Sequence, residues 1–130
     1  MKIDAEPLNE YEAEMVFEAI NLGFSVDTAL TLLDEEMVFE KLNIKDYTRR
    51  KDLSIVRGRL IGTHGKTKNA LEQITGCTIK VKDNSVGIIA HGDTISNTIT
   101  AITNIIRGTK QANAYKYLER INKKKRKIGI

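Results

Sequence analysis

The loop Gly62-Thr63-His64-Gly65 is the part of the sequence whose residue types are best suited to holding a ligand. Glycine at each end lets the backbone turn sharply and lets another molecule's backbone come close. The residues that follow predict a helix beginning at about Lys66, and the unpaired N–H groups at a helix start favour phosphate oxygens. This combination favours binding of a sugar-phosphate backbone rather than catalysis.

Four basic residues stand on either side of this loop. Arg57 and Arg59 precede it, and Lys66 and Lys68 follow it, so all four are expected at the same end of two consecutive helices. Their charges are either phosphate contacts or solvated helix faces, and the sequence leaves both interpretations open. A Gly-x-x-Gly is common by chance. Here Ile61 directly before the loop, the bases around it and the order of neighbouring elements give the motif its weight.

Hydrophobic periodicity between Leu42 and Gly108 predicts the order strand, helix, glycine loop, helix, strand, strand, helix. A three-stranded sheet with helices packed on one face would bury the apolar sides of these elements, which makes the fold class α+β. The expected elements are a strand in the second half of 37–47, a helix over 52–61, a helix closed by Gly76, strands over 77–82 and 86–90 joined by a turn at Asp83-Asn84, and a helix capped by Asp93 and ended by Gly108.

Segments of opposite charge flank this unit. An amphipathic helix is expected over Leu8–Leu22, followed by a second helix from an N-cap at Ser25 through Leu33. Residues 1–40 hold eleven acids and one base, a net charge of −10, whereas residues 41–130 hold twenty bases and six acids, a net charge of +14. A basic body favours a polyanionic partner such as nucleic acid, although a solubilising excess of charge gives the same count.

The last segment, from Lys110, is also basic. Tyr115, Leu118 and Ile121 form a narrow apolar stripe, and residues 120–127 then contain six bases. This run either contacts RNA or is solvated.

Composition excludes several classes of protein. No run of 18 apolar residues is present, so no membrane association is expected, and the acidic start lacks an apolar signal region. Cys77 is the single cysteine, which excludes an internal disulfide and any zinc site built from several cysteines, and we expect a reducing, cytoplasmic setting. His64 and His91 show no metal-ligand spacing. We therefore expect no metal, no cofactor and no enzymatic activity.

The segment from Arg59 to Lys68, followed by Ile74-Thr75-Gly76, resembles a type I KH domain. More specifically, it is similar to the second KH domain of archaeal ribosomal-RNA-processing proteins, which are relatives of the eukaryotic "partner of Nob" pre-ribosomal factor. The resemblance covers roughly residues 13–121. Further matches are Gly23-Phe24-Ser25, Ala29-Leu30, Leu32-Leu33-Asp34 and the segment from Asn113 to Arg120.

The resemblance implies a domain organisation. Residues 36–108 would form the KH domain, with three strands packed against three helices. Residues 1–35 would be an acidic helical extension, similar to the end of a first KH domain, and residues 109–130 a basic helix or tail. Family members typically carry two KH domains, so the chain is expected to be either a fragment or a member that has lost its first domain.

The resemblance also implies a function and a binding site. A KH loop clamps about four single-stranded nucleotides, and the family is expected to bind small-subunit ribosomal RNA near its 3′ end, beside ribosome-assembly or translation-initiation proteins. Where family members often place a lysine or a second glycine, this loop has Thr63 and His64, which add no formal charge at pH 7. The residues expected to contact RNA are Arg57, Arg59, Ile61, Gly62, Thr63, His64, Gly65, Lys66, Thr67, Lys68, Ile79 and Lys80.

Beside the loop, an apolar groove would select bases, with hydrogen bonds from the edge of the second strand. Val56, Leu60, Ile79 and Val81 are candidates for its floor, although each by itself is more typical of a core residue. Three other functions stay open. The fold could be a protein-binding scaffold, which the absence of a lysine inside the loop favours. It could also be an enzyme or a DNA-binding helix-turn-helix.

Overall fold

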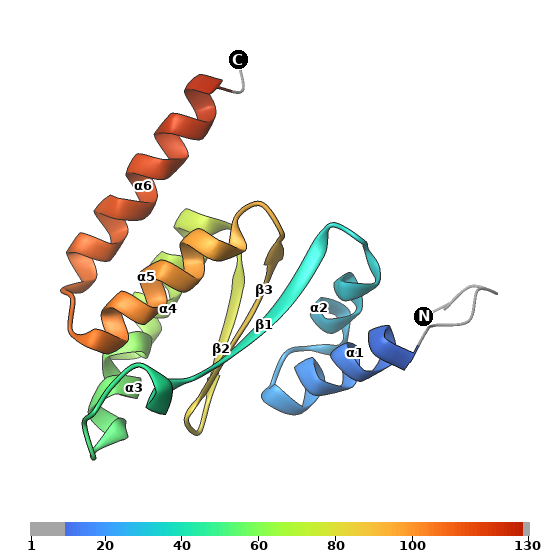
Figure 1. Cartoon of the computed structure of the whole chain (residues 1–130), viewed down its shortest axis with the longest axis horizontal. Coiled ribbons are helices and arrows are strands. Elements are labelled where there is room, and N and C mark those ends of the chain that lie inside the picture. The colour runs from blue at the N-terminus through green and yellow to red at the C-terminus, as the bar shows by residue number, and fades with distance from the viewer. Residues whose placement is uncertain (1–9, 129–130) are drawn as a thin grey trace.

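The computed structural model of this chain describes residues 10–128, with side chains through residue 124. Figure 1 shows a three-stranded sheet between two unequal layers of helices, an α+β fold. The expected helix start at Leu8 and the last bases of the tail, at 125–127, fall outside the backbone or side chains that are described.

The sheet is antiparallel and has the strand order β1-β3-β2. Strand β1 spans Met37–Asn43, β2 spans Thr78–Lys82, and β3 spans Ser85–His91. Strands β2 and β3 form the expected hairpin, with Ile79 opposite Ile88. Because β3 is central, β2 leaves one of its edges unpaired within the sheet.

Three helices cover one face of the sheet, as the sequence predicted. They are α3 (Leu53–Ile61), α4 (Lys66–Thr75) and α5 (Ile95–Arg107), and α6 (Gln111–Ile128) packs across α4 and α5 (Figure 1). The core between them is aliphatic, as expected from a composition poor in aromatics. Its fully buried members include Ile44, Val56, Leu71, Val86, Ile88, Ile102 and Ile105.

Local boundaries differ from the prediction at two places. Strand β1 occupies the first part of 37–47 rather than the second, because Ile44–Asp46 already forms a 3-10 turn whose start is stabilised by the Asn43 side chain. The N-cap of α5 is Thr94 rather than Asp93. By contrast, the caps expected at Ser25 and Gly108 are confirmed.

The second face of the sheet is covered as well, which the sequence analysis did not anticipate. Helix α1 (Glu10–Leu22), α2 (Val26–Leu30) and a 3-10 turn (Thr31–Leu33) pack on it around a separate cluster that contains Phe24, Phe39 and Ile89. The rings of Phe24 and Phe39 meet edge to face at 6.1 Å. Double coverage explains why β3 is a continuous apolar run, since a strand buried on both faces does not alternate.

Gly87 marks the closest approach between this helical layer and the sheet. A Cβ at this position would lie 2.8 Å from Phe24 Cε2 and still closer to Leu22 Cδ2. Both of these side chains are buried. The N-terminal helices are therefore fitted to a glycine in the central strand.

We expect Gly87→Ala to lower the free energy of unfolding by about 1–3 kcal/mol, because the added methyl overpacks this contact. Denaturant unfolding of the purified chain measures the change. Gly92→Ala is the matched control, since its Cβ would meet Val38 Cγ2 at an ordinary 3.4 Å. Equal stability of the Gly87→Ala variant and the parent would contradict the close fit.

Candidate nucleic-acid interface

Helices α3 and α4 meet at a tight corner formed by Gly62, Thr63, His64 and Gly65. Helix α3 ends at Gly62, whose φ of 76° turns the chain out of the helix, and Thr63–Gly65 then make one 3-10 turn. His64 (φ 55°) and Gly65 (φ 75°) are both in the left-handed region. Three positive φ angles within four residues let the chain reverse direction and start α4 at Lys66.

Glycine is required at position 62 for packing as well as for conformation. A Cβ there would lie 2.6 Å from the backbone N of Thr67, which no ordinary contact allows. Thr67 is itself 5% exposed and lies beneath the corner. At Gly65 the nearest atom to such a Cβ is 3.6 Å away, so its positive φ alone favours glycine.

The outer surface of the corner is open. Thr63, His64 and Lys66 are exposed, and Ile61 and Gly65 are half-buried. The first N–H groups of a helical turn have no acceptor earlier in the same helix, so they remain available to a ligand. The corner therefore combines an amide-rich turn with the positive charge of Lys66, as a phosphate site requires.

The two arginines before the corner are engaged elsewhere in the protein. The Arg59 guanidinium donates to the Ile105 carbonyl at 2.9 Å and to the Thr109 carbonyl at 2.7 Å, which caps the C-terminal end of α5. Arg57 donates to Asn84 Oδ1, in the β2–β3 turn, at 2.7 Å. Arg59 thus has a structural role that the sequence analysis did not predict, and Arg57 joins α3 to the hairpin.

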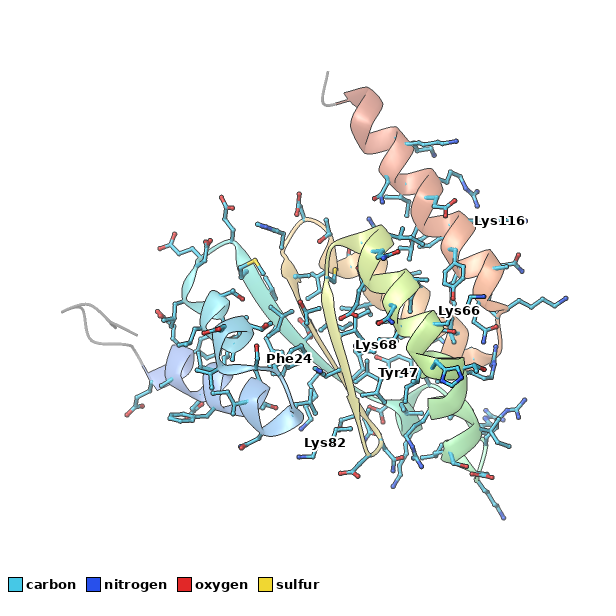
Figure 2. The ribbon with its side chains drawn as sticks, turned by 180° about the vertical axis from the view of Figure 1, so that it is seen from behind. Phe24, Tyr47, Lys66, Lys68, Lys82 and Lys116 are labelled. Carbon is cyan, nitrogen blue, oxygen red and sulfur yellow. The ribbon has the colours of Figure 1, made fainter. Side chains whose placement is uncertain are left out.

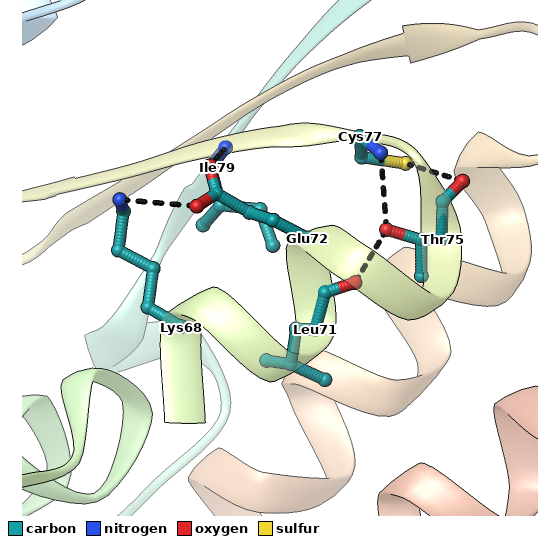
Figure 3. A network of polar contacts seen from close by, with 6 residues as sticks. All are labelled: Lys68, Leu71, Glu72, Thr75, Cys77 and Ile79. Atoms are coloured by element: carbon teal, nitrogen blue, oxygen red, sulfur yellow. Dashed lines mark hydrogen bonds and ion pairs between the residues drawn. The ribbon is translucent and has the colours of Figure 1, made fainter. Parts of the chain in front are cut away.

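The remaining predicted site residues do not all face the corner. Lys68, the third residue of α4 (Figure 2), forms an ion pair of 3.2 Å with Glu72 (Figure 3). The side chain of Ile79 is 2% exposed and belongs to the core, so it offers no surface to a base. Lys80 alternates with Ile79 along β2, and its cross-strand partner is Gly87, so it lies on the opposite sheet face.

The apolar groove expected beside the corner has little open floor in this structure. Val56 and Leu60 are 0% and 3% exposed, and both pack into the core with Ile79. Val81 is the one candidate of the four that is half-buried. Base contacts near the corner would therefore be mostly polar and would come from side chains at the rim.

Glu72 is a site residue that sequence reasoning missed. Its carboxylate joins α4 to the unpaired edge of β2, because Oε1 contacts Lys68 Nζ and Oε2 accepts from the Ile79 backbone N–H at 2.9 Å. The spacing of Lys68 and Glu72, four residues apart on one helix, was the available signal. No pattern in the sequence indicates the bond to β2.

Helix α6 holds a row of basic side chains on its outer surface. Lys116, Arg120 and Lys123 are exposed and spaced by four and three residues, which places them on one helix face. The helix is held at both ends of its contact with the body. Gln111 donates to the Arg59 carbonyl at 3.4 Å, and Asn122 donates to the Ile74 carbonyl at 2.7 Å.

Other chemistry has little support in the described part of the chain. Within residues 10–128 no three His, Cys, Asp or Glu side chains come together as a metal site would need, and Cys77 is buried. None of the helices described is long and apolar enough to cross a bilayer. The pKa of Asp52 is lowered by its hydrogen bonds to the Ser54 side chain and backbone, which reflects its role as N-cap of α3 rather than catalysis.

Comparison with known proteins gives consistent matches. A family profile for the second KH domain of PNO1, described as a eukaryotic-type KH domain (KH-domain type I), matches residues 38–123. The chain is 35% identical to the KH domain-containing protein MJ0443 of Methanocaldococcus jannaschii, over 92% of this chain and 53% of that protein. It is 34% identical to the pre-rRNA-processing protein PNO1 of Debaryomyces hansenii, over 75% of this chain and 40% of that protein.

A solved structure is similar along nearly the whole chain. It is the a/eIF2alpha-aDim2p-rRNA complex from Pyrococcus horikoshii, in which the matched chain gives a TM-score of 0.84 at 35% identity, covering 95% of this chain and 68% of that one. This chain spans about half the length of the curated relatives it matches. The family match runs through residue 123 and so includes most of α6.

We expect Arg59→Ala to lower the free energy of unfolding by about 1.5–3 kcal/mol, because a charged donor is removed from two carbonyls. Arg49→Ala, an exposed arginine in the preceding loop, is the matched control and should leave stability nearly unchanged. Thermal and denaturant unfolding measure both. An Arg59→Ala variant with unchanged stability and weakened RNA binding would show instead that Arg59 contacts phosphate.

Proposed function

This chain belongs to the PNO1 group of type I KH domains, and we propose that it binds single-stranded RNA through the corner Gly62–Gly65. The backbone of about four nucleotides lies against the corner, as in other KH domains. The RNA is the small-subunit ribosomal RNA near its 3′ end, during assembly of the subunit. This role is non-enzymatic and cytoplasmic.

One observation carries the proposal: the corner is built at some conformational cost and is left exposed. His64 adopts a left-handed backbone conformation that non-glycine residues use rarely, and its side chain is not buried by any element. An ordinary helix end uses one left-handed residue, whereas this corner has three positive φ angles within four residues. Residues held in sparsely populated conformations at an exposed turn are typical of ligand sites.

The charge around the corner supports a polyanion. Lys66 lies directly beside it, and the exposed row of Lys116, Arg120 and Lys123 on α6 extends the positive surface. We propose that this row contacts RNA outside the clamped nucleotides. Such contacts make the affinity salt-dependent, with a log–log slope of about −0.7 for each phosphate neutralised on a single strand.

The relatives support the choice of RNA and of partners. One is named as a pre-rRNA-processing protein, and the similar solved chain was crystallised with ribosomal RNA and an initiation-factor subunit. By this likeness we propose small-subunit ribosomal RNA as the ligand and a translation-initiation protein as a neighbour on it.

A protein-binding scaffold is the second candidate. It is favoured by the internal contacts of Arg57, Arg59 and Lys68, because these leave Lys66 as the one basic residue of the predicted four whose side chain extends freely into solvent. If the fold bound only protein, charge at the corner would have no effect on RNA.

We expect the double substitution Thr63→Asp, His64→Asp to weaken binding of single-stranded RNA by at least about tenfold, or ~1.4 kcal/mol. Two carboxylates would repel the phosphates, while aspartate tolerates the left-handed conformation at position 64. Fluorescence anisotropy with a labelled RNA of the ribosomal 3′ end measures the affinity, and circular dichroism checks the fold.

Asn21→Asp with Ser25→Asp is the matched control. It adds the same two charges on the N-terminal helices, across the sheet from the corner, and aspartate replaces serine well as an N-cap. This control should lower RNA affinity less than threefold. Equal affinities of the corner variant and the parent would favour the scaffold over the RNA-binding function.

A further inference from the structure

The second turn of α4 and the free edge of β2 are joined by one carboxylate. Figure 3 shows Glu72 between Lys68 and Ile79, with Oε1 3.2 Å from Lys68 Nζ and Oε2 2.9 Å from the Ile79 backbone N. Both side chains of the ion pair are 23% exposed, so the pair is shielded on its inner side and open on its outer side. It follows the corner by one helical turn.

An edge strand presents unpaired N–H and C=O groups that can pair with a ligand. Alternate residues of β2 direct these groups toward β3 or toward the free edge, and the bond to Glu72 shows that the N–H of Ile79 points to the free edge. A base bound at this edge would normally accept a hydrogen bond from that N–H. Here the donor already has a partner within the chain.

That partner is hard to displace. An N–H bond to a carboxylate is roughly twice as strong as one between neutral groups, whereas a base offers only a neutral ring nitrogen or carbonyl. The ion pair between Lys68 and the other carboxylate oxygen also holds the Glu72 side chain in this position. The carboxylate is therefore expected to stay in place when RNA binds, and the base meets Glu72 rather than the strand edge.

We propose that Glu72 is a specificity-determining residue that selects a nucleotide with an exocyclic amino group and rejects uridine; this inference rests on the RNA-binding function proposed above. A carboxylate offers about four lone-pair sites, and Lys68 and Ile79 use one on each oxygen. The outward-facing lone pairs accept from an amino group. Lys68 keeps two further donors for a neighbouring ring nitrogen or carbonyl.

Uracil is disfavoured because it is the RNA base without an exocyclic amino group. Its single ring N–H is flanked by two carbonyl oxygens, which would lie against the carboxylate. Cytosine has nearly the same shape but presents an amino group beside an unprotonated ring nitrogen, and glutamate is a known acceptor for that amino group. A comparison of cytidine with uridine therefore tests the hydrogen-bond pattern of the base while its size stays nearly constant.

The test compares binding of an eight-nucleotide cytidine RNA with an eight-nucleotide uridine RNA at fixed salt. We expect the parent chain to prefer the cytidine RNA by at least about fivefold, near the lower limit for a specific base contact of ~1 kcal/mol. In Glu72→Gln the amide carbonyl still accepts from Ile79, but an amino group replaces the outward acceptor. The preference should fall below about twofold or reverse.

Glu119→Gln is the matched control, since it makes the same chemical change at an exposed position on α6 and should keep the parent's preference. The test uses the ratio of the affinities for the cytidine RNA and the uridine RNA, because loss of a negative charge raises both affinities. A parent that binds both RNAs equally, or a folded Glu72→Gln variant that keeps the preference, would overturn the inference while the RNA-binding function stands. A parent that binds neither RNA would overturn that function instead.

Discussion

The contact between Gly62 and Thr67 is the constraint on which the rest of the candidate site depends. Because the backbone N of Thr67 would be 2.6 Å from any Cβ at position 62, the first residue of the corner cannot carry a side chain. This close approach brings the end of α3 onto the start of α4. The next two residues, Thr63 and His64, lie exposed on the surface.

The surrounding layers hold this corner in place. Arg59 ties the end of α3 to the end of α5, and Gln111 ties the same turn to α6. On the far side, α1 and α2 cover the sheet that supports α3 and α4. A corner held in this way would not have to become ordered when the proposed ligand binds, and such preorganisation lowers the entropic cost of binding.

Much of this arrangement followed from the sequence. The glycine pair, the Asp52–Ile61 periodicity and the alternation after Cys77 predicted two helices, the loop and a hairpin, because each signal is local. The partners of Arg59 and Glu72 were not predictable, since they lie on elements distant in the chain. Coverage of the second sheet face was missed for a similar reason. The apolar run of β3 indicates burial but does not say which segment provides it.

The basic residues that are neighbours in the sequence around the corner have different roles in the structure. Of the charges that appear clustered in sequence, Lys66 remains at the corner, while Arg57 and Arg59 bind other parts of the fold. In the proposed complex, backbone amides and local geometry would then contribute more to phosphate binding than side-chain charge does. In the proposed complex, the Glu72 carboxylate beside the edge of β2, rather than an apolar floor, would distinguish bases.

The most direct measurement is a titration of the ¹⁵N-labelled chain with single-stranded RNA from the ribosomal 3′ end, followed by two-dimensional NMR. We expect the largest shifts of backbone amides from Gly62 to Lys66, with smaller shifts along the outer face of α6. Unchanged amides at Thr63 and His64, with shifts confined to α1 and α2, would contradict RNA binding at the corner.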